Sequence, residues 1–257
     1  MNLVDKKAEF KGLVKYAYKT MGTAIADYGM LKDGDRVLIG VSGGSDSLLL
    51  LKLFQMRQAR IPIDFEIAVC FVDTNFIKIN KAALKRYVKF LGIEYIVKEL
   101  KLKKSEINCF WCSWSRRKII FEAARAGGFN KVALGHNLDD IIETTLMNLF
   151  FNGEVSTMKP KVELFHGKLT VIRPLCYLEK TKIIEAVSRF SFPDTQYDCP
   201  YGGNSARKKV REVIKNLEAD YPDIKKSIFG ALGRIRKDYL LDAKPREKHS
   251  KRELAVR

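Results

Sequence analysis

Residues 36–47 read Arg-Val-Leu-Ile-Gly-Val-Ser-Gly-Gly-Ser-Asp-Ser, and this stretch decides the fold. Its first half is an almost unbroken run of aliphatic residues, which is typical of a strand buried on both faces of a parallel sheet. Gly43–Gly44 then permit a tight turn and a close approach of the backbone to an anion. Ser45–Ser47 are residue types that favour the start of a helix, where free N–H groups bind phosphate. The stretch therefore predicts a strand, a phosphate loop and a helix in succession.

Asp46 adds a metal ion to this prediction. A carboxylate would be repelled by a bare phosphate, so we expect a Mg²⁺ ion that bridges the two. A glycine turn in front of a well-capped helix would explain Gly43–Gly44 alone, without any ligand. The whole string Ser42–Ser47 is more specific than such a turn, and it matches neither a Walker A loop nor a dinucleotide-binding loop.

The rest of the chain alternates strands with helices. Strands are expected at residues 36–41, 65–72, 94–100, 131–135 and 170–173, and helices at 45–59, 80–91, 116–126, 138–151 and 179–190. The alternation predicts an α/β fold with a doubly wound, mainly parallel, five-stranded sheet. Helical spacing of apolar residues predicts an N-terminal helical extension at 1–30, followed by the main domain at 31–195. A basic helical C-terminal extension is expected at 196–257.

Ligands bind such sheets beyond the carboxyl ends of the strands, and polar residues follow two more of these ends. Asp73 follows the second expected strand, and Gly135-His136-Asn137-Leu138-Asp139-Asp140 follows the fourth. One imidazole and two carboxylates at a helix start can bind Mg²⁺ or transfer a proton. The preference of acidic residues for helix N-termini would explain Asp139 or Asp140 singly, but not His136 beside both.

The five cysteines do not suggest a disulfide framework, because their number is odd and we expect a cytoplasmic protein. Cys109 and Cys112 have CxxC spacing, just after an expected strand and before an expected helix. Such a pair can chelate a metal or cluster, or form a redox disulfide. No second CxxC completes a zinc site; with Cys199 as the remaining candidate, three cysteines suit a [4Fe–4S] cluster with one open iron. Cys70 and Cys176 are expected to be structural.

Several of these motifs resemble one protein family. The string SGGSDS at Ser42–Ser47 resembles the signature of the PP-loop (N-type) ATP pyrophosphatase superfamily, which has the adenine nucleotide alpha hydrolase-like fold. The strings GHNLDDIIET at 135–144, CFWCSWSRR at 109–117 and VIRPL at 171–175, with a late third cysteine, resemble the tRNA 2-thiocytidine synthetase family. They also resemble the related 2-thiouridine synthetases. The resemblance covers most of the chain, from about residue 36 to about residue 220.

This resemblance implies an ATP-dependent tRNA thiolase. ATP would bind at Ser42, Gly43, Gly44, Ser45, Asp46, Ser47, Asp73 and Gly135, with Mg²⁺ at Asp46. Cys109, Cys112 and Cys199 would hold the [4Fe–4S] cluster, and Asp140, Arg116 and His136 would have catalytic roles. AMP would be attached to C2 of a pyrimidine, with cytidine in the anticodon loop as the expected target. Sulfur from a cysteine desulfurase or inorganic sulfide would then replace the AMP group at C2.

Two departures separate the chain from the 2-thiouridine synthetases. Those enzymes carry a lysine four residues after the CxxC, where this chain has Arg116, and zinc-binding cysteine pairs at their ends, which this sequence lacks. Around Cys199 the sequence also departs from the P-C-N-L-C pattern of the thiocytidine family and keeps one cysteine. The alternatives are a 2-thiouridine synthetase, a PP-loop RNA ligase of the lysidine-synthetase type, and a non-catalytic iron–sulfur or zinc RNA-binding module.

The charge balance favours a nucleic-acid partner. Forty-seven Lys and Arg against thirty Asp and Glu give a net charge of +17, and such a field attracts polyanions. A solvated, lysine-rich surface would have the same composition. The expected tRNA contacts are Arg117, Lys118, Arg207, Lys208, Lys209 and Arg211. Trp111 and Trp114 are aromatic surfaces on which an everted base can stack.

The sequence predicts no membrane association. It has no run of about 18 apolar residues, and its start does not resemble a secretory signal. A homodimer is left open.

Overall fold

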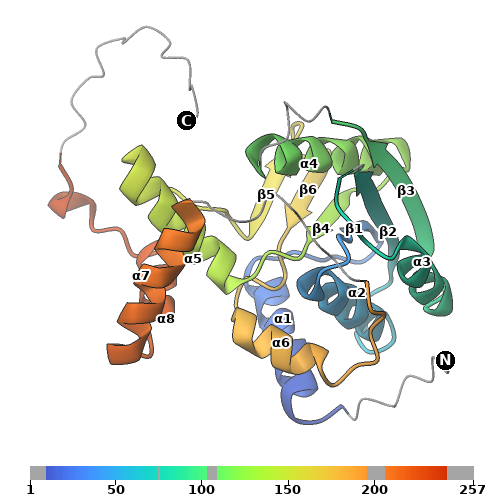
Figure 1. Ribbon diagram of the computed structural model, residues 1–257, viewed down its shortest axis with the longest axis horizontal. Coiled ribbons are helices and arrows are strands. Elements are labelled where there is room, and N and C mark those ends of the chain that lie inside the picture. The colour runs from blue at the N-terminus through green and yellow to red at the C-terminus, as the bar shows by residue number, and fades with distance from the viewer. Residues whose placement is uncertain (1–9, 75, 103–108, 196–205, 242–257) are drawn as a thin grey trace, which may run out of the picture.

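The computed structural model describes residues 10–74, 76–102, 109–195 and 206–241 (Figure 1). Within these residues six strands form one sheet in the order β3-β2-β1-β4-β6-β5. The strands are β1 (Asp35–Gly40), β2 (Phe65–Thr74), β3 (Glu94–Leu100), β4 (Lys131–Leu134), β5 (Lys161–Leu164) and β6 (Leu169–Ile172). All neighbouring pairs are parallel except β5 and β6. The predicted doubly wound α/β fold is confirmed.

Helices cover both faces of this sheet. They are α1 (Gly12–Asp27), α2 (Ser45–Gln58), α3 (Lys81–Phe90), α4 (Cys109–Ala126), α5 (Leu138–Met147), α6 (Lys180–Val187), α7 (Ala206–Asp220) and α8 (Ile224–Ala231), with short turns η2 (Asn148–Asn152) and η3 (Lys237–Tyr239). Figure 1 shows α4 on one face of the sheet and α1, α2 and α6 on the other.

The alternation of side chains along β1 explains the two layers. Val37 and Ile39 belong to the core under α1, α2 and α6, and Leu38 belongs to the core under α4. All three are fully buried. A fully buried aliphatic side chain contributes about 1.5–3 kcal/mol to the stability of the fold. Because its side chains are buried on both faces, β1 lies at the centre of the sheet. The strand order reverses between β1 and β4, and ligands bind at such a point.

The expectation of five strands was wrong, because β5 adds a sixth at the edge of the sheet. β5 is short and runs antiparallel to β6, so it does not follow the strand–helix alternation that revealed the others. The hairpin turn also lacks the usual Asn-Gly or Asp-Gly signal. Phe165 and His166 instead have positive φ angles of 53° and 56°, ahead of Gly167 at 82°.

We expected the CxxC motif to precede a helix. It lies instead in the first turn of one. α4 begins at Cys109, seven residues before the predicted start at Arg116. The cysteines and aromatic residues in between have only modest helix propensity, which hid this turn. Ile120, Ala123 and Ala124 of the same helix are packed into the core of the sheet, and this packing outweighs propensity.

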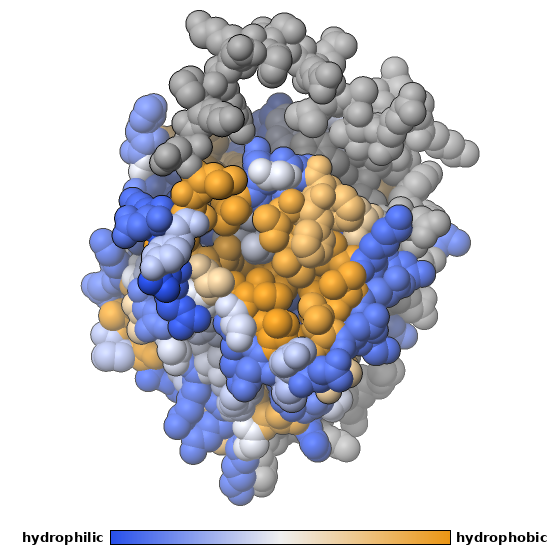
Figure 2. Space-filling view, turned by 90° about the vertical axis from the view of Figure 1, so that its left-hand side faces the viewer, coloured by the Kyte–Doolittle hydropathy of each residue, from blue (hydrophilic) through white to orange (hydrophobic). Residues whose placement is uncertain are grey.

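The C-terminal helices α7 and α8 pack beside α5, away from the sheet (Figure 1). Their small core joins Ile142 and Leu146 of α5 to Val210 and Ile214 of α7. Figure 2 shows this side of the molecule, where an apolar area is bordered by hydrophilic residues. The exposed large hydrophobic residues of η2 and α7 are Leu149, Phe150, Phe151, Val213 and Leu217. Apolar patches of this kind mark interaction surfaces.

No helix in the described ranges combines the length and the apolar character that a membrane span needs.

Candidate active site

The turn between β1 and α2 has the geometry of an anion-binding loop. Gly43 has a φ of 90°, and its carbonyl oxygen accepts a hydrogen bond from Oγ1 of Thr195 at 2.7 Å. The Ser47 hydroxyl donates to the Gly44 carbonyl oxygen at 2.8 Å and accepts from the Ser42 N–H at 3.2 Å. α2 begins directly after this turn, and the N–H groups of its first turn are the donors that an anion would use.

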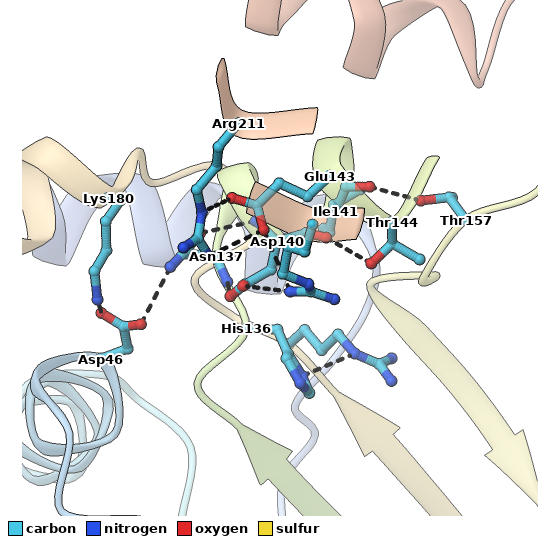
Figure 3. Close-up of polar contacts among 12 residues, drawn as sticks. Asp46, His136, Asn137, Asp140, Ile141, Glu143, Thr144, Thr157, Lys180 and Arg211 are labelled. Carbon is cyan, nitrogen blue, oxygen red and sulfur yellow. Dashed lines mark hydrogen bonds and ion pairs between the residues drawn. The ribbon is translucent and has the colours of Figure 1, made fainter. Parts of the chain in front are cut away.

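The carboxyl end of β4 packs against this loop. A Cβ atom at Gly135 would lie 3.1 Å from the backbone nitrogen of Ser47, so glycine permits the approach. Asn137 and Asp140 form a reciprocal capping box at the start of α5, with both hydrogen bonds at 3.1 Å. The Asn137 side-chain amide also donates to Oδ2 of Asp46 at 3.2 Å (Figure 3). One residue therefore connects the two motifs that the sequence singled out.

Lys180 is a loop contact that sequence reasoning missed. It lies at the start of α6, and its ammonium donates to Oδ1 of Asp46 at 2.5 Å and to the Ser45 hydroxyl at 3.1 Å. Figure 3 shows Lys180 and Asn137 approaching Asp46 from different sides. Lys180 is 134 residues from Asp46 in sequence, and no motif surrounds it. Its charge can neutralise a bound phosphate.

A cavity of about 510 Å³ lies beyond the ends of β1 and β4. This volume is in the range of small-molecule sites. Three segments that are far apart in sequence line it: the loop, the end of β4 with the start of α5, and the second turn of α4. Their polar lining residues are Ser42, Asp46, Ser47, His136, Asp140, Ser113, Arg116 and Arg117, and Arg207 joins them from α7.

Glu143 is the buried acid that holds α7 in place. Its side chain is 3% exposed, and its two oxygens accept from Nε and Nη2 of Arg211 at 2.5 and 3.1 Å. This bidentate geometry is the strongest form of the arginine–carboxylate pair. Arg207 lies 3.3 Å from the same carboxylate and 3.3 Å from that of Asp140. Two arginines that we expected to contact RNA therefore have carboxylate partners within the protein.

The pKa of Asp140 differs from that of an exposed aspartate. Burial raises its pKa, against the opposing effects of the Asn137 N–H and the positive charge of Arg207. A carboxyl group with a raised pKa is closer to protonation at neutral pH, and it can exchange a proton more readily.

His136 is held in its neutral form. Burial, followed by the positive charges of Arg173, Arg117 and Arg207, lowers its pKa to about 3. Its Nδ1 accepts a hydrogen bond from Nε of Arg173 at 3.3 Å, which requires an unprotonated nitrogen. Burial likewise lowers the pKa of Arg173 to about 10. The imidazole therefore presents a neutral face to the cavity across the physiological pH range.

The pKa of His136 predicts acid sensitivity of the fold. Between pH 6.5 and pH 3 the unfolded chain binds a proton at this residue that the folded chain does not, so stability falls as pH falls. The contribution is at most about 1.4 kcal/mol per pH unit. His136→Asn keeps an acceptor for Arg173 but cannot titrate. Chemical denaturation at pH 7, 6 and 5 should show a shallower decline for this variant than for the wild type, and equal slopes would contradict the assignment.

The three proposed cluster ligands are only partly described. Cys112 is buried in the first turn of α4, whereas the side chain of Cys109 and the whole of Cys199 lie outside the described residues. Within the described part of the chain no group of three or more His, Cys, Asp and Glu side chains could hold a metal ion.

Cys70 and Cys176 are fully buried in the two cores, as expected. Burial raises the pKa of Cys70 to about 11 and that of Cys176 to about 12, so both thiols are unreactive.

Four further predicted residues are not among those that line the cavity at the ends of β1 and β4: Asp73, Lys118, Lys208 and Lys209. Asp73 is the next-to-last residue of β2 and pairs with Lys81 at 2.5 Å, while its Oδ1 is buried with no hydrogen-bond partner among the described residues. An acceptor left in this state is available to a ligand or a water molecule. Lys118, Lys208 and Lys209 are exposed on α4 and α7.

The comparison with protein families agrees with this geometry. The model of the PP-loop domain family matches residues 14–214. The chain belongs to the PP-loop family. The family expected from the sequence is confirmed.

Two curated relatives and one solved structure are similar to most of this chain. The tRNA-cytidine(32) 2-sulfurtransferase of Geobacter sulfurreducens is 34% identical over 233 residues, which cover 86% of this chain and 90% of the relative. The protein of that name from Dechloromonas aromatica is 36% identical over 241 residues, covering 90% of this chain and 84% of the relative. Among solved structures, the U34-tRNA thiolase NcsA from Methanococcus maripaludis with its [4Fe-4S] cluster has a TM-score of 0.73 at 24% identity, covering 86% of this chain and 78% of that one. This last likeness supports the PP-loop fold.

Proposed function

We propose that this protein is an ATP-dependent tRNA thiolase that replaces the C2 oxygen of a cytidine with sulfur and releases AMP and pyrophosphate. The proposal rests on one cavity, which the PP-loop lines on one side and the helix of the CxxC motif lines on the other. The two curated relatives described above are tRNA-cytidine(32) 2-sulfurtransferases, and they supply the substrate class.

The chemistry of the loop fits Mg-ATP. A Cβ atom at Gly43 would lie 2.3 Å from the side chain of Ile79, so only glycine allows the loop to pack this closely at a φ of 90°. The first turn of α2 supplies N–H donors for phosphate oxygens, and Lys180 supplies a positive charge. Asp46 is the oxygen ligand that Mg²⁺ would take. The proposed nucleotide site comprises Ser42, Gly43, Gly44, Ser45, Asp46, Ser47, Asp73 and Gly135.

The cavity offers groups for both halves of the reaction. In the first half, the C2 oxygen of the base attacks the α-phosphorus of ATP, and pyrophosphate leaves. Arg116 and Arg117 line the cavity and can stabilise the negative charge on the phosphate oxygens. In the second half, hydrosulfide attacks C2, the C2–O bond breaks, and AMP leaves with that oxygen. Asp140, whose pKa is raised by burial, can accept the proton that hydrosulfide gives up, while His136 stays neutral and can only hydrogen-bond to the reacting groups.

The cysteines suit a cluster beside this cavity. Positions 109 and 112 are three apart in α4, and positions three apart in a helix are neighbours on its surface. Cys199 itself lies outside the described residues; of the described residues on either side of it in sequence, Thr195 is bonded to Gly43 and Arg207 lines the cavity. A [4Fe–4S] cluster on three thiolates has one iron free to bind sulfide.

A reaction with defined components tests the proposal. Protein purified without oxygen and reconstituted with iron and sulfide is incubated with Mg-ATP, sulfide and unmodified tRNA. We expect AMP release that requires RNA, and 2-thiocytidine in the nucleoside digest by mass spectrometry. Formation of 2-thiouridine would show instead that the protein is a 2-thiouridine synthetase. AMP release without any thionucleoside would contradict thiolation and favour a ligase.

A further inference from the structure

A second hollow lies on the other side of Arg117. It has a volume of about 590 Å³ and lies between α4 and the turn that joins β5 to β6. Arg117 lines this hollow and also the cavity proposed to bind ATP, so the two cavities share a lining side chain. The residues that shape it are Trp114, Arg117, Lys118, Phe121, Arg125 and Phe165. Nothing in the proposed ATP chemistry uses this space.

Two aromatic side chains are exposed at this hollow. Trp114 is 44% exposed and Phe165 is 57% exposed, and both line the same hollow, so two aromatic faces are accessible to one ligand there. The ammonium of Lys118 lies 5.6 Å from the centre of the Trp114 ring, so the aromatic face is already used for a cation–π contact.

The backbone that presents Phe165 is strained. Phe165 has a φ of 53°, in the left-handed region that a bulky residue rarely adopts, and His166 follows at 56°. This conformation is unfavourable for any residue with a side chain. A polar residue or glycine would fit this turn better, and a strained turn that exposes an aromatic ring suggests a binding role.

The charges around the hollow select a nucleotide and orient it. Arg117, Lys118 and Arg125 provide three positive groups for a phosphate backbone. Glu122 also lines the hollow, and its carboxylate lies 4.0 Å from the Lys118 ammonium. A carboxylate repels phosphate but accepts an N–H from the edge of a base. A base therefore fits inside the hollow, with its phosphates on the basic rim.

We propose that this hollow binds the base of a nucleotide adjacent to the one that is modified. The inference rests on the proposed function, because it requires an RNA strand whose target base enters the ATP cavity. Adjacent nucleotides of a splayed single strand would then occupy the two hollows on either side of Arg117. Stacking against Trp114 and Phe165 would hold the neighbouring base, as aromatic residues do in other RNA-binding proteins.

Binding of a labelled RNA hairpin tests the inference without catalysis. The probe is a synthetic anticodon stem-loop with the target cytidine in its loop, and the dissociation constant is measured by fluorescence anisotropy. Phe165→Ala and Trp114→Ala should each weaken binding about ten-fold. Alanine at position 165 keeps the same left-handed strain, so the turn changes little. Phe90→Ala removes a ring that is 51% exposed on α3, a helix that packs into the core on the opposite face of the sheet from α4, and should bind like the wild type.

Abasic probes identify the nucleotide. The same hairpin is prepared with an abasic nucleotide on the 5′ or the 3′ side of the target cytidine. For one of the two, wild type and Phe165→Ala should bind equally, because the stacking partner is already absent. The inference is overturned if Phe165→Ala binds the intact hairpin as tightly as the wild type, or if its defect is the same on all three probes. Tight, ring-dependent binding without thiolation would instead contradict the proposed function and leave the base pocket standing.

Discussion

Replacing Cys112 with alanine is expected to abolish thiolation of tRNA while ATP binding persists. The thiol would be lost from the proposed cluster, and two cysteines do not hold a [4Fe–4S] cluster in place of three. The ATP cavity should be preserved, because Ser113 and Arg116 line it and Cys112 does not. The measurements are absorbance near 400 nm after anaerobic reconstitution, thionucleoside content by mass spectrometry, and ATP affinity by calorimetry.

Cys176→Ala is the matched control for this experiment. Cys176 is fully buried in the core under α1 and α6, so its replacement removes the same sulfur atom at a packing position. It should lower stability by about 1 kcal/mol or less and leave the 400 nm absorbance and the thionucleoside yield unchanged. If Cys112→Ala retained both signals, or if Cys176→Ala lost them, the cluster assignment would be wrong.

The parts of the site that the sequence predicted are local. Ser42–Ser47 and the string from Gly135 to Asp140 each place their polar residues within one turn that follows a buried strand. Such a turn is specified by residues adjacent in sequence, so its backbone and its capping box can be anticipated. The same holds for the parallel strands, whose apolar runs are contiguous.

The contacts that complete the site are long-range, and for that reason they were missed. Lys180 reaches Asp46 across 134 residues, and Thr195 reaches Gly43 across 152. Neither residue has neighbours that mark it, because its role exists only once β6 has brought the segment that follows it to the loop. Arg207 was predicted to contact RNA from its charge and its position after Cys199 in the sequence, whereas its carboxylate partners on α5 become visible only in three dimensions. Charge predicts attraction to anions, but it does not distinguish an RNA phosphate from a buried glutamate.

Replacing Gly43 with alanine is expected to weaken ATP binding about ten-fold or more while the fold survives. The φ of 90° at this position is unfavourable for any residue with a side chain, and the added Cβ would lie 2.3 Å from Cδ1 of Ile79. The strain costs about 1–2 kcal/mol, and the loop can relieve it only by leaving the phosphate-binding geometry. ATP affinity by calorimetry and stability by thermal denaturation separate the two effects.

Gly34→Ala and a double variant distinguish two causes of weaker ATP binding in Gly43→Ala: the left-handed backbone and the contact with Ile79. Gly34 has a φ of 75° and open space where a Cβ would stand, so its replacement imposes similar strain outside the site. It should lower stability and leave ATP affinity unchanged. Gly43→Ala with Ile79→Ala removes the close contact but keeps the strain. If backbone conformation controls the PP-loop, the double variant binds ATP as weakly as Gly43→Ala. Restored affinity would show that the contact with Ile79, and not the left-handed backbone, requires glycine at position 43.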